Sequence, residues 1–314
     1  MALVVVAGVA GHQLGALPVP ITLASHTSLT IDNPYAGGGD WYKGDLQIAS
    51  IRGVGKDLPS AISDWYRGHG YDFLGISDQN TYTWDSEYSR PGFTGMPAVD
   101  ASYPFADVVA VGIDHWLPAD NLQSAIDWIG HDGGLALLAA PLAPAKPQSL
   151  PQLLALHGLF GFEVYDARLA AINPGQGDAT ADWDRLLSAG HHVYGFAGDD
   201  LLSLSDPTVG SAWINVLAPA PDLDSLFISL RAGAFTASTG ADFVRFSVSG
   251  TTITVEAAPG CSLRFIGRSG RLLTSIAGSS GSYRVTGDEG YVRVEALRDD
   301  GGRAWSQPFF LSRR

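Results

Sequence analysis

Side chains that could bind transition metals or act as nucleophiles are few in this chain. Cys261 is the only cysteine, so neither a disulfide within the chain nor a cysteine-type zinc site can form. His191 and His192 are adjacent, but they precede a predicted strand, which favours a surface position. His69 comes just before Gly70 at a predicted helix end, where a cation suits the helix dipole. The histidines are His12, His26, His69, His115, His131, His157, His191 and His192.

From about residue 41 to residue 240 the sequence predicts both strands and helices, and these elements must position the functional side chains. Short apolar runs typical of buried strands alternate with stretches whose apolar residues recur at helical spacing. The predicted strands are 44–50, 71–77, 135–139, 162–165 and 192–197. The predicted helices are 58–66, 122–129 and 179–188. This β-α-β-α order predicts an α/β fold with a mostly parallel sheet, closed as a barrel.

The pattern changes after Gly240. Four later segments alternate apolar and polar residues with period two, between Gly- and Ser-rich turns, which predicts a small antiparallel β-domain. These segments are 243–249, 251–256, 262–266 and 290–296. We therefore predict an N-terminal β segment (1–38), an α/β barrel domain (39–240) and a β-sandwich-like C-terminal domain (241–314).

Five short motifs follow one another along the barrel part. They are QIAS at 47–50, SDQN at 77–80, the stretch 97–112, LAAP at 138–141 and GDDLLS at 198–203. In this order they resemble the PHP (polymerase and histidinol phosphatase) superfamily, in its CehA/McbA, carbaryl-hydrolase-like branch. The resemblance extends from about Asn33 to the C-terminus. It implies a distorted (β/α) barrel with a small antiparallel β-domain, built around a metal-dependent hydrolase site.

In that family the motifs carry histidines that help to hold two or three metals, which activate a water and bind a phosphate or ester oxygen. Here all six matching positions hold other residues, and none of the chain's histidines replaces them. Alanine and leucine have no lone pair to offer a metal, so the resemblance implies no catalytic residue, no metal cofactor and a degenerate site. The six positions are Gln47, Ala49, Gln79, Asp107, Ala140 and Leu202.

Four aspartates remain at positions that the resemblance places around the same site. They are Asp78, Asp100, Asp107 and Asp200. With the amides of Gln47 and Gln79 they would form an all-oxygen shell. Converging carboxylates repel one another, so at least one would take up a proton or the pocket would stay hydrated. A hard cation such as Ca²⁺ or Mg²⁺ would also relieve the repulsion, although the sequence favours a hydrated acidic pit.

Composition narrows the classes of partner. The formal net charge is −13, and the only lysines are Lys43, Lys56 and Lys146, with no basic run. Nucleic acid and anionic membranes are bound by clustered Lys and Arg, so both are excluded as main partners. Charged residues make up only 16% of the chain, which leaves neutral surface for a protein partner or self-association.

The first ten residues are almost entirely apolar. They are too few to span a bilayer, and a buried strand is favoured over the remnant of a signal segment. The compartment is therefore weakly determined, with the cytoplasm slightly favoured and a secreted or periplasmic location as the alternative.

Three functions compete at this point. The first is a PHP-fold pseudoenzyme that acts as a non-catalytic binding or structural component of an assembly. The second is a divergent metal-dependent phosphoesterase or esterase with a rebuilt site. The third is a small-molecule binding protein that keeps the cleft. In each case Glu163, at a predicted strand end, is expected to make a scaffold hydrogen bond rather than to orient a ligand.

Overall fold

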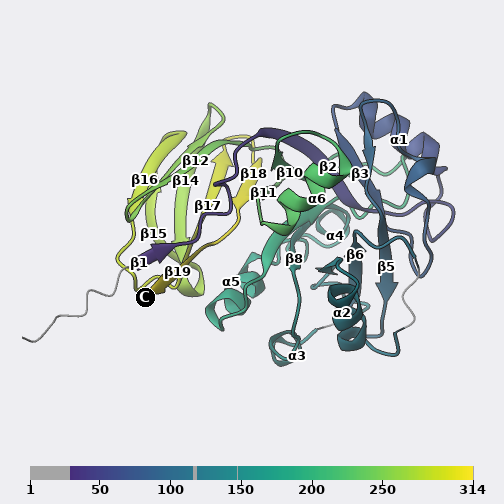
Figure 1. Cartoon of the computed structure of the whole chain (residues 1–314), viewed down its shortest axis with the longest axis horizontal. Coiled ribbons are helices and arrows are strands. Elements are labelled where there is room, and N and C mark those ends of the chain that lie inside the picture. The colour runs from purple at the N-terminus through teal and green to yellow at the C-terminus, as the bar shows by residue number, and fades with distance from the viewer. Residues whose placement is uncertain (1–28, 116–118, 147, 314) are drawn as a thin grey trace, which may run out of the picture.

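The computed structural model describes residues 29–115, 119–146 and 148–313 (Figure 1). The N-terminal apolar stretch, His12 and His26 lie outside the described residues. Every described α-helix lies between Pro59 and Arg231, and strands follow from there to the C-terminus. The described helices are α1 (Pro59–Gly68), α2 (Leu122–His131), α3 (Leu150–Leu154), α4 (Ala167–Ile172), α5 (Thr180–Ser188) and α6 (Leu223–Arg231). Two 3-10 helices, η1 (Asp85–Glu87) and η2 (Arg268–Gly270), complete the set.

One sheet of eleven strands runs through both parts of the molecule. Its path is β1-β19-β17-β18-β11-β10-β2-β3-β4, and β14 pairs with β17 and with β15. The strands are β1 (Leu29–Ile31), β2 (Asp40–Ile48), β3 (Phe73–Ile76), β4 (Thr94–Gly95), β10 (Trp213–Ala218), β11 (Phe235–Ser238), β14 (Cys261–Gly267), β15 (Arg271–Ile276), β17 (Tyr291–Arg298), β18 (Arg303–Ser306) and β19 (Phe309–Arg313). Because β11 pairs with β18, hydrogen bonds cross the expected boundary near residue 240, and the three-part division stays a prediction.

A second sheet has the order β5-β6-β7-β8-β9. Its strands are β5 (Ala98–Ser102), β6 (Asp107–Val111), β7 (Leu135–Ala139), β8 (Gly161–Asp166) and β9 (Tyr194–Gly198). Strands β7, β8 and β9 are parallel, whereas β5, β6 and β7 pair in antiparallel fashion. Residues 103–106 join β5 to β6, and so short a connection permits only a hairpin.

The two sheets do not close into the expected barrel. Within the described residues they are linked by single bridges, one between Ile48 and Leu201 and one between Gln79 and Asp100. The expectation of a closed, mostly parallel barrel is thus corrected to an incomplete ring with an antiparallel segment. Strand pairing between distant segments decides this closure, and a local apolar pattern carries no information about it.

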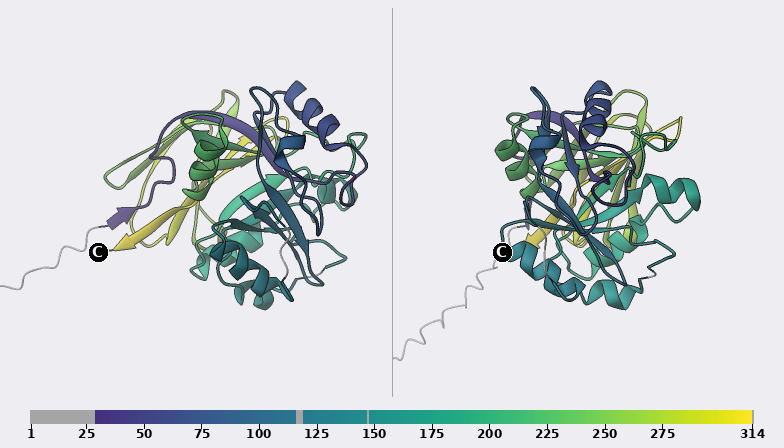
Figure 2. Two further views of the ribbon diagram at one scale, coloured as in Figure 1. Left: turned by 45° about the vertical axis from the view of Figure 1, so that its right-hand side comes forward. Right: turned by 90° about the vertical axis from the view of Figure 1, so that its right-hand side faces the viewer.

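The C-terminal strands form a second β-layer with its own core. A sheet of β12 (Phe243–Ser249), β13 (Thr252–Ala257) and β16 (Ser280–Arg284) shares a hydrophobic core with residues of β14 and β17. Along β13 the buried residues alternate with more exposed ones, as the period-two pattern predicts. In the left view of Figure 2 these green and yellow strands lie on the side of the molecule away from α1.

The helices pack by the apolar faces that their spacing predicts. In α1, Pro59 occupies the first turn, where a missing N–H costs no hydrogen bond, and Ile62 and Tyr66 are buried one turn apart. Helix α2 buries Ile126 and Ile129 against β6 and β7. Among the described helices, none is both long enough and apolar enough to cross a membrane.

Candidate functional site

A cavity of about 270 Å³ lies where β2, β3, β7 and β9 reach their carboxyl ends. Eight of the nine positions singled out from the sequence line it. They are Gln47, Ala49, Gln79, Asp100, Asp107, Ala140, Asp200 and Leu202. Side chains that follow neighbouring strand ends meet at one edge of a sheet, which is where α/β proteins place their sites. The motif order thus converges on one place in the fold.

The structure does not bring Asp78 into this shell. Its carboxylate is fully buried and accepts hydrogen bonds from the backbone N–H of Ser50 at 2.6 Å, the hydroxyl of Ser50 at 2.5 Å and the hydroxyl of Thr83. These contacts tie the loop after β2 to the end of β3. Asp78 is therefore a scaffold residue, whose acceptor atoms face the protein rather than the cavity.

Two cationic side chains also line the cavity, and sequence reasoning missed both. The Lys146 ammonium lies 2.5 Å from Oδ1 of Asp107 and 2.6 Å from the hydroxyl of Ser102. The Arg168 guanidinium donates to Oδ2 of Asp200 from Nη2 at 2.5 Å and from Nε at 2.9 Å. Each of the two carboxylates has thus acquired a positive partner from the protein itself.

A signal for these cations does exist in the sequence. Lys146 is one of only three lysines in a chain of net charge −13, and it follows the LAAP motif by a few residues. Arg168 comes directly after β8, in the first turn of α4. In a chain poor in lysine, a basic residue in a segment that follows a strand is therefore a candidate counter-charge for a carboxylate site.

The remaining carboxyl groups are buried and hold their protons more tightly than in water. Burial, and then the charges of Asp107 and Asp200, raise the pKa of Asp100 well above its ordinary value. Burial and the neighbouring Asp166 do the same to the pKa of Glu163. Burial, and then the charge of Asp200, raise the pKa of Asp166 to about 7. The sequence-based expectation that at least one carboxyl takes up a proton agrees with these directions.

Glu163 is buried and links two segments that line the cavity. Its Oε2 accepts hydrogen bonds from the backbone N–H of Ala140 at 2.5 Å and from the amide of Gln47 at 3.3 Å. Four buried oxygens nearby accept no hydrogen bond from the described residues. They are Gln47 Oε1, Asp100 Oδ1, Glu163 Oε1 and Asp166 Oδ2. Such acceptors are costly unless a proton, a water or a ligand donor satisfies them.

The backbone around the cavity is strained. Ala140 has φ 43°, Asp200 has φ 49° and Asn80, next to Gln79, has φ 56°. Non-glycine residues pay about 1–2 kcal/mol for this left-handed conformation, and such residues cluster at functional sites. Three turns at strand ends around the cavity therefore have an unfavourable backbone geometry.

The residues present do not fit a transition-metal centre. Within the ranges 29–115, 119–146 and 148–313, no group of three or more His, Cys, Asp or Glu is arranged to hold a metal ion. Ala49, Ala140 and Leu202 present no donor atom. Lys146 and Arg168 already contact the carboxylates of Asp107 and Asp200, and an ammonium or guanidinium cannot act as a ligand.

The described histidines do not line the cavity. His69 ends α1 and stacks on Trp65, with ring centroids 3.7 Å apart, and His192 stacks on Phe310 at 4.0 Å. His115 contacts Asp114 and Asp132 near the end of α2. These contacts are structural and lie away from the cavity lining.

Known proteins resemble the chain in structure rather than in sequence. No family model and no curated protein matches it. A two-domain protein from Bacteroides vulgatus, which contains a predicted PHP-like metal-dependent phosphoesterase, matches with a TM-score of 0.52 and 11% identity, over 90% of this chain and 98% of that one. An amidohydrolase from Chromobacterium violaceum, with bound sulfate and no metal, covers 52% of this chain and 88% of its own, with a TM-score of 0.39 and 14% identity.

The first of these matches spans both parts of the chain. It shows that this chain shares the fold of that protein over 90% of its residues, with a mixed α/β part and a β-rich part. Sequence identity this low shows the fold alone. Assignment to the CehA/McbA branch stays a prediction.

Proposed function

We propose that this chain is a PHP-fold pseudoenzyme that acts as a non-catalytic binding or structural component. One observation carries the proposal: Lys146 and Arg168 pair with Asp107 and Asp200 inside the cavity lined by the positions that resemble metal-ligand motifs. In a metallohydrolase, divalent ions would neutralise such carboxylates. Here fixed side chains supply the positive charge, and they cannot generate a metal-bound hydroxide.

The chemistry of hydrolysis is missing along with the metals. Attack on a phosphoester or ester needs an activated water and a positive group that stabilises the developing oxyanion. The six histidine positions of the resembled family hold Gln47, Ala49, Gln79, Asp107, Ala140 and Leu202. A divalent ion placed beside Lys146 and Arg168 would also be repelled by both, which lowers the affinity of any residual cation site.

Exposed apolar side chains beside the cavity could form a surface for a partner. Val54 lines the cavity and is 52% exposed, while Ile51, Leu58 and Trp84 are 49%, 56% and 61% exposed. Ile51 and Leu58 line one groove together with Tyr82, whose ring packs edge-on against that of Trp84. Large apolar side chains gathered around a site indicate a contact surface for a protein partner or a second copy of the chain.

A divergent hydrolase is the second candidate, and one observation favours it. Asp100 lines the cavity, and its pKa is raised well above its ordinary value by burial first and then by Asp107 and Asp200. A carboxyl group in a cleft whose pKa is raised by burial is a candidate general acid. A rebuilt site of this kind would act without the lost histidines.

Metal content and turnover distinguish the two candidates. Purified protein should contain no stoichiometric Mn, Fe or Zn by elemental mass spectrometry. It should not hydrolyse p-nitrophenyl phosphate or p-nitrophenyl acetate above the protein-free rate when Mn²⁺, Zn²⁺ or Fe²⁺ is supplied. Turnover that disappears in Asp100→Asn and persists in the exposed control Asp224→Asn would establish a rebuilt site and overturn the pseudoenzyme proposal.

A further inference from the structure

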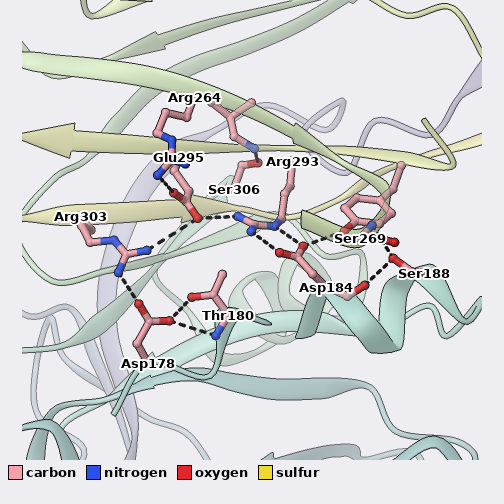
Figure 3. A network of polar contacts seen from close by, with 12 residues as sticks. Asp178, Thr180, Asp184, Ser188, Arg264, Ser269, Arg293, Glu295, Arg303 and Ser306 are labelled. Carbon is pink, nitrogen blue, oxygen red and sulfur yellow. Dashed lines mark hydrogen bonds and ion pairs between the residues drawn. The ribbon is translucent and has the colours of Figure 1, made fainter. Parts of the chain in front are cut away.

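A second cavity, of about 670 Å³, lies between α5 and the sheet formed by β14, β17 and β18 (Figure 3). It shares no lining residue with the first cavity. Four arginines and three carboxylates line it, in a chain whose net charge is −13. They are Arg185, Arg264, Arg293, Arg303, Asp178, Asp184 and Glu295. This concentration of guanidinium groups is unexpected for so acidic a protein.

One of these arginines is fully used by the protein. Arg293 is buried and donates to Asp184 from Nε at 2.8 Å and from Nη2 at 2.7 Å, and to Glu295 from Nη1 at 2.8 Å. The hydroxyl of Tyr291 donates to the same Asp184 at 2.7 Å. Arg293 therefore acts as a clamp between α5 and β17, and each of its three nitrogens already donates to a carboxylate.

Two other arginines, Arg264 and Arg303, lie beside Glu295 in Figure 3 and make fewer close contacts than Arg293. Among the described residues, the side chain of Arg264 makes no hydrogen bond, and its Nη1 forms an ion pair with Glu295 at 3.5 Å. Arg303 donates one N–H to Asp178 at 2.5 Å, while its Nη2 is 3.7 Å from Glu295. The Nε of Arg303 is buried and has no acceptor. A guanidinium has five N–H donors, so this pair offers many more than the nearby carboxylates take.

The carboxylates at this cavity do not cancel the excess of donors. Glu295 already accepts from Arg293. Burial acts to raise the pKa of Asp178, but hydrogen bonds from Thr180 and the charge of Arg303 outweigh it and hold that pKa below its ordinary value. Arg185 is paired with Asp182, outside the cavity lining. The surplus donors are therefore those of Arg264 and Arg303.

The backbone next to these arginines is also strained. Ser269, in η2, has φ 61°, and the three other described non-glycine residues with positive φ lie at or next to the first cavity. The backbone N–H of Ser269 donates to the hydroxyl of Ser188 at 2.7 Å, so the strained turn is held against the end of α5. Strain retained at a cavity wall is a feature of binding sites.

We propose that this second cavity binds a small molecule through an oxyanion group, a phosphate or a carboxylate, held by Arg264 and Arg303. The planar fork of arginine matches both groups and binds them with paired hydrogen bonds. An oxyanion would accept from the N–H groups of Arg264 and Arg303 that the nearby carboxylates leave free. The cavity is large enough to hold the remainder of a small organic molecule or several waters.

Calorimetric titration of the full chain tests this site, with sodium phosphate in one arm and sodium succinate in the other at constant ionic strength. Saturable binding is expected in at least one arm, and the arm that responds identifies the phosphate or the carboxylate. Arg264→Gln should weaken binding about tenfold or more, because a charge-assisted pair of hydrogen bonds is lost. Arg264→Lys keeps the positive charge but not the planar fork of arginine, so its affinity for the anion should lie between those of the parent and Arg264→Gln.

Arg264 is the suitable position because its side chain is 42% exposed and makes no hydrogen bond within the described structure, so the variants should fold. Arg284→Gln, at an exposed position of β16, is the matched control and should bind like the parent. The proposal is overturned if neither anion gives saturable binding below roughly 10 mM, or if Arg264→Gln binds as tightly as the parent. Either result would leave the proposal for the first cavity standing, since the two share no residue.

Discussion

Replacing Lys146 by methionine removes the cation that stands beside Asp107 and keeps a side chain of similar length. In the parent protein the ammonium lies 2.5 Å from Oδ1 of Asp107, with 22% and 19% of the two side chains exposed. Exposed ion pairs contribute about 0–1 kcal/mol, and breaking a buried pair costs about 3–5 kcal/mol. A pair that is about four-fifths buried lies between these limits. We expect a loss of about 2 kcal/mol at pH 7.5.

The loss arises because Asp107 remains as a buried charge without its partner. A second substitution, Asp107→Asn, removes that charge and should recover a large part of the stability. Since the two residues are in direct contact, a double-mutant cycle should give a coupling energy of about 1 kcal/mol or more. Lys56→Met, at an exposed lysine, is the matched control and should change the free energy of unfolding by less than about 0.5 kcal/mol.

Urea denaturation, followed by circular dichroism, measures these free energies. A parallel series of thermal melts with EDTA, Mg²⁺ or Ca²⁺ tests whether Lys146 substitutes for a metal. The parent should respond to neither chelator nor cation. Lys146→Met should be stabilised by millimolar Mg²⁺ or Ca²⁺, because an all-oxygen carboxylate group is then left without a counter-charge. Two results would refute the idea that Lys146 neutralises the site in place of a metal. One is a Lys146→Met variant as stable as the parent, and the other is a parent protein that loses stability in EDTA.

Two further predictions concern the same cavity. Burial, and then Asp200, raise the pKa of Asp166 from 3.8 to about 7, so the stability that this group contributes is complete below about pH 4 and is lost as pH rises to about 7. Asp166→Asn keeps an acceptor for the N–H of Leu169. Its free energy of unfolding relative to the parent should increase between pH 4.5 and pH 8, by up to about 4 kcal/mol, as measured by urea denaturation at each pH. A difference that does not change with pH would contradict the raised pKa of Asp166. Ala140→Gly should raise the free energy of unfolding by about 1 kcal/mol, because glycine adopts φ 43° without strain. The neighbouring Ala139→Gly, within β7, should lower it, and equal effects at the two positions would show that the turn is unstrained.

Much of the local structure follows from the sequence. The helical spacing at 58–66, 122–129 and 179–188 matches α1 (Pro59–Gly68), α2 (Leu122–His131) and α5 (Thr180–Ser188). The period-two segments after Gly240 match β12, β13, β14 and β17. These patterns are predictable because they depend on neighbours three or four residues away in a helix, or two away in a strand. The ring of strands was not predictable in this way, since its open seams depend on pairing between distant segments.

The place of the candidate site was likewise determined by the order of motifs along the chain. Six of the eight lining positions lie at or just after the carboxyl ends of β2, β3, β7 and β9, as expected for parallel strands. Asp100 and Asp107 come instead from the antiparallel hairpin of β5 and β6. The direction of each side chain was not determined. Asp78 follows a strand as Asp200 does, yet hydrogen bonds from Ser50 and Thr83 turn it into the scaffold.

Only the tertiary structure decided what neutralises the cavity. Lys146 is 39 residues from Asp107, and Arg168 is 32 residues from Asp200. The amino-acid sequence by itself predicts a site without metal-binding histidines, because residue types alone decide which atoms can be ligands. It does not predict which cations pair with the carboxylates. Lys146 lies on a loop and Arg168 in the first turn of α4, and the paths of both segments depend on how the whole chain packs. A Coulomb interaction depends on distance in space rather than along the sequence.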